Sequence, residues 1–193
     1  MDAVQFFMTR YGSARASGEG LFQGLTDEQI RTCPHPAVNS IAWLIWHMAR
    51  AEDLAVSRLV ARRPPVISDG AWPVRLGVSR RDVGTGMTDD EVADLSARLN
   101  LDGLRSYWDA VGERTVSVVQ ALSPEQLDEI NEPEYVRQIC AEDGLFVDEA
   151  GWVITYLEGK TKGLMLSQLA LSHLFSHIGE ARVTRALFGL RDA

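Results

Sequence analysis

Cysteine is scarce in this chain. Only two are present, Cys33 and Cys140, and they lie far apart in no recognisable spacing. A disulfide framework is therefore excluded, and this cysteine usage is typical of a reducing cytoplasm, where we expect the protein to be located. The N-terminal residues, MDAVQFFMTRYGS, also lack the basic stretch followed by an apolar block that marks a secretory signal, so we expect none.

Long apolar runs and clusters of basic residues are missing as well. No run reaches the roughly 18 to 20 apolar residues of a membrane-spanning helix, which argues against a membrane protein. The net charge is −8, and the sequence contains no basic cluster. Because phosphate contacts provide most of the affinity of nucleic-acid binders, DNA and RNA are not expected partners.

The rest of the composition is that of a globular protein. The chain has 193 residues, of which 46% are hydrophobic and 24% are charged. That length allows one domain with a sizeable core, so we expect residues 1–193 to form a single domain.

Most of the chain has helical patterning. Thr26–Gln29 and Ser123–Gln126 are capping boxes, and Ser40 offers a cap to a long apolar run that Pro64 ends. The pattern predicts four long helices, at residues 3–24, 41–63, 88–122 and 164–188. We therefore predict an all-α fold, a four-helix bundle with long crossovers.

Two segments between the helices are harder to interpret. Residues 64–87 are rich in glycine and proline and are typical of a long loop. Within residues 131–162, the runs LFV and WVITYLEG flank an acidic DEAG turn. β-Branched and aromatic residues around such a turn predict a small β-hairpin before the last helix.

The run SHLFSHIGE places two of the four histidines, His173 and His177, four residues apart. Residues at this spacing share one face of a helix, and the neighbours along that face are mostly apolar. Buried imidazoles need partners for their ring nitrogens, and a metal ion bound by both would provide one. A pair of histidines packed in the core without a metal is the competing interpretation.

A third ligand is expected, and His47 and His35 are the candidates. His47 lies on the flank of the apolar stripe of the second helix and can point at a neighbouring helix, although a lone histidine there is more often a boundary residue. His35 lies between two prolines, where side chains usually face solvent, and is the weaker candidate. The residues alone favour His47 over His35 as a third ligand beside His173 and His177, for a divalent ion such as Zn, Ni or Fe.

Two carboxylates could assist such a site. Glu180 lies one turn after His177 and could orient it, act as a fourth ligand or serve as a catalytic base; a surface salt bridge to Arg182 or Arg185 is the alternative. Glu52 falls within the apolar arc of the second helix, where a carboxylate should be paired with a cation or a histidine. A pairing that fixes helix packing is the favoured interpretation of Glu52.

The runs NSIAWLIWHMARAED and SQLALSHLFSHIGEAR resemble the DinB-like superfamily, the DinB/YfiT-like metalloenzymes. The resemblance implies a four-helix bundle in which His47, His173 and His177 bind a divalent metal. It also implies kinship with transferases that use low-molecular-weight thiols such as mycothiol or bacillithiol. On that basis we expect a thiol-dependent S-transferase acting on a small-molecule substrate.

Three other functions stay open. The same metal site could act without catalysis, in sensing or structure, or it could serve a metal-dependent hydrolase. A metal-free bundle that binds a protein partner is the third. A homodimer is the usual default for a small bundle of this kind.

Overall fold

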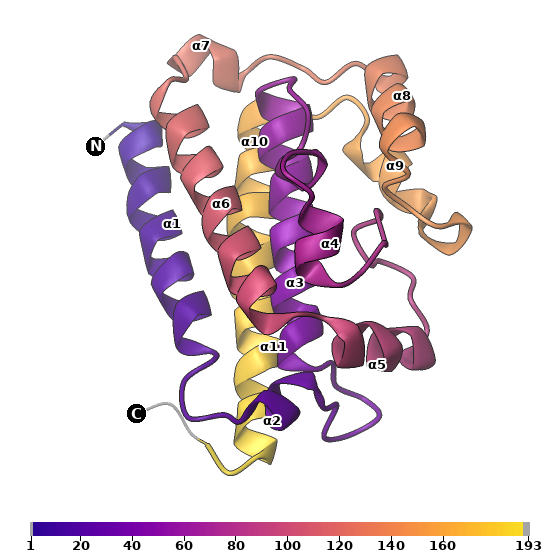
Figure 1. Ribbon diagram of the computed structural model, residues 1–193. Helices are drawn as coiled ribbons and strands as arrows, with labels where there is room; N and C mark the ends of the chain where they lie inside the picture. Colours follow the sequence, from indigo (N-terminus) through magenta and orange to yellow (C-terminus); the bar gives the residue numbers. More distant parts are fainter. Residues whose placement is uncertain (1, 191–193) are drawn as a thin grey trace.

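Four long helices form the body of the protein, which is represented here by a computed structural model that describes residues 2–190. They are α1 (Ala3–Gly20), α3 (Ile41–Asp53), α6 (Leu101–Gln120) and the C-terminal pair α10 (Lys162–Ser167) and α11 (His173–Leu187). Figure 1 shows these helices running side by side along the long axis of the molecule. The predicted all-α four-helix bundle is therefore confirmed.

Both histidine-bearing helices contain a π-helical segment. The segment η1 (Leu54–Val60) continues α3, and η4 (Gln168–Ser172) joins α10 to α11 directly before His173. A π-helical turn holds one more residue than an α-helical turn, and such turns are frequent at functional sites. The side chains before and after each of these segments therefore do not share one straight stripe.

The helix starts follow the capping chemistry of the sequence. Thr26 and Ser123 cap α2 (Asp27–Arg31) and α7 (Pro124–Leu127) through the two predicted capping boxes. The segment predicted as one helix over 88–122 is two helices, α5 (Asp89–Arg98) and α6. The break lies at Asn100, whose side chain accepts a hydrogen bond from the Gly103 backbone and starts α6 afresh.

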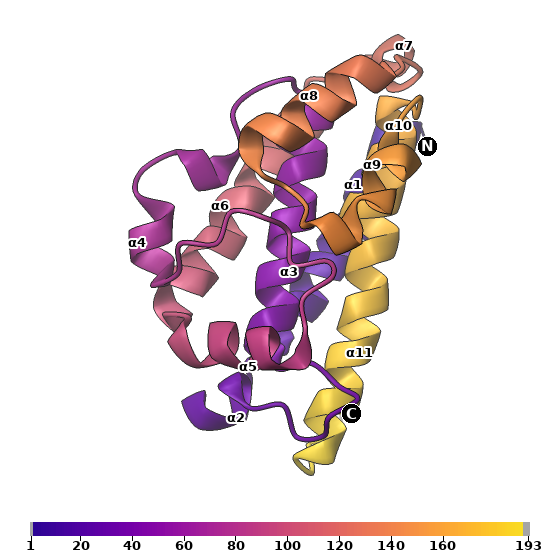
Figure 2. The same ribbon diagram turned by 90° about the vertical axis from the view of Figure 1, so that its right-hand side faces the viewer.

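The two crossovers contain short helices. The first holds the 3₁₀ turn η2 (Val66–Ser68) and α4 (Trp72–Leu76), and the second holds α7, α8 (Pro133–Asp143), η3 (Asp148–Ala150) and α9 (Trp152–Leu157). In Figure 1, α8 and α9 lie on the side of the bundle away from α1. Figure 2 views the molecule from that side and shows α3 and α11 running next to each other.

The predicted β-hairpin before the last helix is wrong. No strand occurs in residues 2–190; the one isolated bridge joins Ile130 to Thr161. The segment WVITYL is α9 instead, and its apolar side chains pack with those of α8 and η1, Leu157 being fully buried. Packing at helical spacing has overridden the local β propensity of the valine, isoleucine and tyrosine.

The bundle interior also holds a charged network. Asp53 is fully buried and accepts hydrogen bonds from Ser57, Tyr107 and the backbone N–H groups of Val66 and Ile67. The Arg50 guanidinium lies 3.5 Å from the Asp53 carboxylate. This network fixes the first crossover and α6 to α3.

Arg50 extends the network by donating a hydrogen bond to the Arg81 carbonyl. The segment that precedes residues 83–87 is therefore fixed to α3 as well. Between residues 2 and 190, no helix is long and apolar enough to span a membrane.

Candidate metal centre

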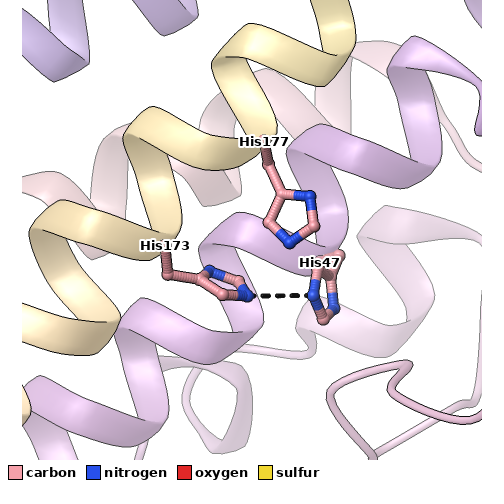
Figure 3. Close-up of side chains that lie close together, drawn as sticks. All are labelled: His47, His173 and His177. Carbon is pink, nitrogen blue, oxygen red and sulfur yellow. Dashed lines mark hydrogen bonds between the residues drawn. The ribbon is translucent and has the colours of Figure 1, made fainter.

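His47 is a buried side chain in the middle of α3. Its Nδ1 lies 2.5 Å from the Val83 carbonyl oxygen, and the Trp43 ring stacks on the imidazole with 4.6 Å between centroids. A carbonyl only accepts hydrogen bonds, so Nδ1 carries the hydrogen and Nε2 keeps its lone pair. The Nε2 atom faces the two histidines of α11 (Figure 3).

His173 and His177 project from successive turns of α11 toward His47. The Nε2 atoms of His173 and His47 are 3.0 Å apart, and the His173 and His177 ring centroids are 4.4 Å apart. Figure 3 shows the three rings turned toward one another. One nitrogen from each ring lies within 4.8 Å of the others, so the predicted three-histidine cluster is present in the fold.

Glu180 orients His177. Its carboxylate lies 2.8 Å from His177 Nδ1, and its other oxygen accepts a 2.7 Å hydrogen bond from the Asn39 side chain. A carboxylate partner places the hydrogen on Nδ1, so His177 Nε2 also has a free lone pair. Burial alone would raise the pKa of Glu180, but the hydrogen bonds from His177 and Asn39 outweigh it, and the pKa is lowered.

Two imidazoles are kept neutral by their surroundings. Burial lowers the pKa of His47 to about 4, with His177 adding repulsion, and burial lowers the pKa of His173 to about 2, with both other histidines contributing. A metal ligand must be a neutral imidazole, so both rings are in the required form at neutral pH.

The donor set fits a divalent transition metal. Zinc binds imidazole nitrogens at about 2.0–2.1 Å, which places tetrahedral donors roughly 3.4 Å apart. The His47–His173 separation of 3.0 Å and the upper limit of 4.8 Å within the cluster bracket that value. His173 Nδ1 is buried without a hydrogen-bond partner in the described chain, so this ring lacks the kind of partner that Val83 and Glu180 provide to the other two.

A cavity of about 640 Å³ opens beside the three histidines. Its walls come from α3, the loop at 83–87, the segment at 146–157 and the α10–α11 helix. Volumes of this size hold small-molecule ligands. The cluster therefore has both metal-type donors and space for a second molecule.

The remaining candidates lie elsewhere. His35 is exposed, as expected, and neither Cys33 nor Cys140 lines the cavity or joins the histidine cluster in the described chain. Glu52 is fully buried, accepts hydrogen bonds from the Tyr11 and Thr115 hydroxyls and faces Arg15 at 3.8 Å. The favoured interpretation of Glu52 as a packing residue agrees with these contacts.

Sequence reasoning missed three contributors to the site. Asn39, which precedes the predicted helix cap Ser40, donates a hydrogen bond to Glu180. Val83 holds His47 through its carbonyl, and its own N–H donates to the Leu145 carbonyl. Gly84 follows with φ +89° and passes so close to Trp46 that a Cβ would lie 2.6 Å from the ring, and this glycine was the one signal that could have identified the loop.

The metal-free protein is expected to lose stability on acidification below pH 6.5. The pKa of His47 is about 4 in the folded chain, against about 6.5 unfolded, so between these values the unfolded chain binds more protons. His47 should then lower the free energy of unfolding by up to about 1.4 kcal/mol for each pH unit. Urea titrations of chelator-treated protein at pH 7, 6 and 5 measure it.

The control for that titration is His47→Gln, which removes the titrating ring. Its unfolding free energy should depend less steeply on pH across the same interval. Equal slopes in the two proteins would show that His47 is not kept neutral by the fold.

Comparisons with known proteins support the same fold. The sequence pattern of the DinB superfamily matches residues 10–147. A crystal structure described as a conserved protein from Enterococcus faecalis is similar to the chain, with a TM-score of 0.75 and 22% sequence identity over 98% of this chain and 99% of that one. At this identity the likeness shows the fold alone. No curated protein sequence matches the chain.

Proposed function

The chain belongs to the DinB superfamily, and on that premise we propose that it is a metal-dependent S-transferase that joins a low-molecular-weight thiol to a small molecule. One observation carries the proposal: three imidazoles from α3 and α11 have nitrogens within 4.8 Å of one another beside a cavity of about 640 Å³. A divalent ion held by three neutral imidazoles keeps coordination positions open and lowers the pKa of a thiol that reaches it.

The surrounding residues prepare the histidines for that role. The Val83 carbonyl and the Glu180 carboxylate fix the rings of His47 and His177, so that both present Nε2. Such partners hold a ligand's orientation and raise its basicity. Glu180 is therefore proposed as a positioning residue and not as a catalytic base, because its oxygens are already occupied by His177 and Asn39.

The thiol itself is proposed to come from outside the chain. Neither cysteine lines the cavity among the described residues, so a small thiol such as mycothiol or bacillithiol would supply the sulfur. Location in the cytoplasm, where such thiols stay reduced, remains a prediction from the cysteine usage, and a homodimer remains the default expectation for a small bundle.

The cluster favours an enzyme over a structural metal site. Structural zinc sites are closed by four protein ligands, whereas catalytic sites use three and leave a position open. Within residues 2–190 only the three histidines make up the cluster, and the cavity adjoins it. Hydrolysis would use the same open position for water, and the assay below separates the two reactions.

The test is a turnover assay with protein loaded with Zn²⁺, Ni²⁺ or Fe²⁺. In one set of reactions, each thiol of a panel is supplied together with an aryl halide electrophile. In a second set, the same electrophile and an ester substrate are supplied without any thiol. Thiol-dependent turnover is expected, and His177→Ala should abolish it. Glu180→Gln should lower the metal affinity about 10- to 100-fold, since it acts through His177.

Glu134→Gln is the matched control, because Glu134 is exposed on α8 and lies outside the cavity lining. It should leave metal affinity and turnover unchanged. Turnover that survives His177→Ala would disprove the proposed role of the cluster, and ester hydrolysis without thiol would favour the hydrolase.

A further inference from the structure

One part of the cavity wall is aromatic and aliphatic. Phe146, Val153 and Leu157 line it together with Trp152 and Tyr156 of α9. All five belong to one short part of the second crossover, so a single segment supplies the surface on which a bound molecule would rest. Such walls bind ligands through apolar contact and aromatic packing.

The side chains of Trp152 and Tyr156 are exposed to solvent. Their exposed fractions are 66% and 41%, although both are large aromatic residues and line the cavity. Two exposed aromatic side chains one turn apart on α9 mark a surface that a ligand could cover.

The cavity offers no counter-charge to an anion. None of its lining residues is a lysine or arginine within the part of the chain that the structure describes, and Asp89 is the one carboxylate among them. Lys160 lies outside the lining, with its ammonium 5.8 Å from the Tyr156 ring centroid. Glu180, behind His177, adds a second negative charge nearby.

The polar groups of the cavity are otherwise neutral. Thr85, Gln168, Ser172 and Ser176 offer hydroxyl and amide groups along its edge. A carboxylate or phosphate moved from water into these surroundings would lose its hydration without gaining a cation. Within the lining itself the positive charge would be that of the metal ion, and only the ligand group that reaches the imidazoles could contact it.

From these observations we propose that the cavity selects a small uncharged molecule with an aromatic or aliphatic body. That body lies against Trp152 and Tyr156, and a ligand that would place a carboxylate or phosphate against this wall is rejected. The inference rests on the proposed function for the position of the reacting group, but the selection itself arises from the walls of the cavity.

A matched pair of thiols tests this selection. The probes are 4-methylbenzyl mercaptan and 4-(mercaptomethyl)benzoate, which differ only in a methyl group against a carboxylate. Calorimetric titration into Co²⁺-loaded protein at pH 7.5 gives the two affinities. We expect the neutral thiol to bind at least tenfold more tightly, since an unpaired anion is costly to bury.

Variants locate the cause of the selection. Trp152→Ala should weaken the neutral thiol about fivefold, whereas Val183→Ala should leave it unchanged because Val183 is exposed on α11 outside the lining. Ser172→Arg places a cation on the cavity edge and should shift the ratio of affinities toward the carboxylate. Equal affinities of the two thiols, or no binding of the neutral one, would overturn the inference.

The absorption of Co²⁺ separates this inference from the proposed function. A sulfur that reaches the ion gives a thiolate-to-cobalt charge-transfer band, whichever probe binds more tightly. The band with equal affinities would leave the function standing and remove the selection. Tighter binding of the neutral probe without the band would keep the selection and remove the thiol chemistry at the metal.

Discussion

Replacing His47 by alanine is expected to lower the affinity for Zn²⁺ by about a thousandfold. Zinc binding to a structural site of four protein ligands is worth roughly 10–16 kcal/mol, so one ligand contributes up to about 4 kcal/mol, and each 1.4 kcal/mol is a factor of ten. His47 is also the ligand whose Nε2 lies 3.0 Å from that of His173. Competition with a chromophoric chelator measures the affinity.

His35→Ala is the matched control, since it removes the fourth histidine of the chain from an exposed position. It should bind Zn²⁺ as the unaltered protein does. The two variants should have the same helical content in the absence of metal, so that a difference in affinity reports the ligand and not the fold. A His47→Ala protein that retains the full affinity would remove α3 from the metal site.

Asp53→Ala is expected to destabilise the protein by about 3–5 kcal/mol. The substitution leaves the Arg50 guanidinium buried beside α3 without its carboxylate, and it leaves the backbone N–H groups of Val66 and Ile67 without an acceptor. Urea unfolding of the metal-free protein measures the loss. The first crossover, which Asp53 fixes to the bundle, should also become accessible to protease.

Two further variants define the cause. Asp94→Ala breaks an exposed ion pair with Arg98 on α5 and should change stability by no more than about 0.5 kcal/mol. Replacing Asp53 and Arg50 together by leucine and methionine should cost less than Asp53→Ala alone, because no unpaired charge remains. If the double variant is the less stable of the two, the buried pair is not the source of the effect.

The histidine pair of the last helix could be predicted because its information is local, whereas His47, 126 residues from His173, was assigned to the same site through the resemblance to the DinB-like superfamily. The spacing of His173 and His177 fixes a shared helix face, and the apolar stripe beside His47 directs that ring toward a neighbouring helix. Capping residues such as Thr26 and Ser123 likewise determine where a helix begins, because they bond only with groups three residues further along the chain. Each of these inferences needs only residues within a turn or two of one another.

The rest of the site depends on contacts between distant segments. The hydrogen bond between Val83 and His47 joins residues 36 positions apart, and the one between Asn39 and Glu180 joins residues 141 positions apart. Nothing in the neighbouring sequence indicates either pairing. The π-helical segment before His173 changes the phase of the last helix, which a uniform 3.6-residue period cannot anticipate. The helix α9 was mistaken for a strand because its burial against α8 and η1, and not its own propensity, determines its conformation.

Metal selection at the cluster follows from the ligands only in part. Three imidazoles accept Zn, Ni, Fe and Cu, and the affinity order of these ions does not determine which one a cell supplies. The partners of the rings, the Val83 carbonyl and the Glu180 carboxylate, act on any of these ions in the same way. Elemental analysis of protein purified without added metal would identify the resident ion.

X-ray diffraction with anomalous scattering, on crystals of protein purified without chelator and soaked in Zn²⁺, tests the metal site most directly. We predict one anomalous peak about 2.0–2.1 Å from Nε2 of His47, His173 and His177. The absence of a peak there after soaking, or a peak bonded to His173 and His177 with His47 turned away, would contradict the three-histidine centre on which the proposed function depends.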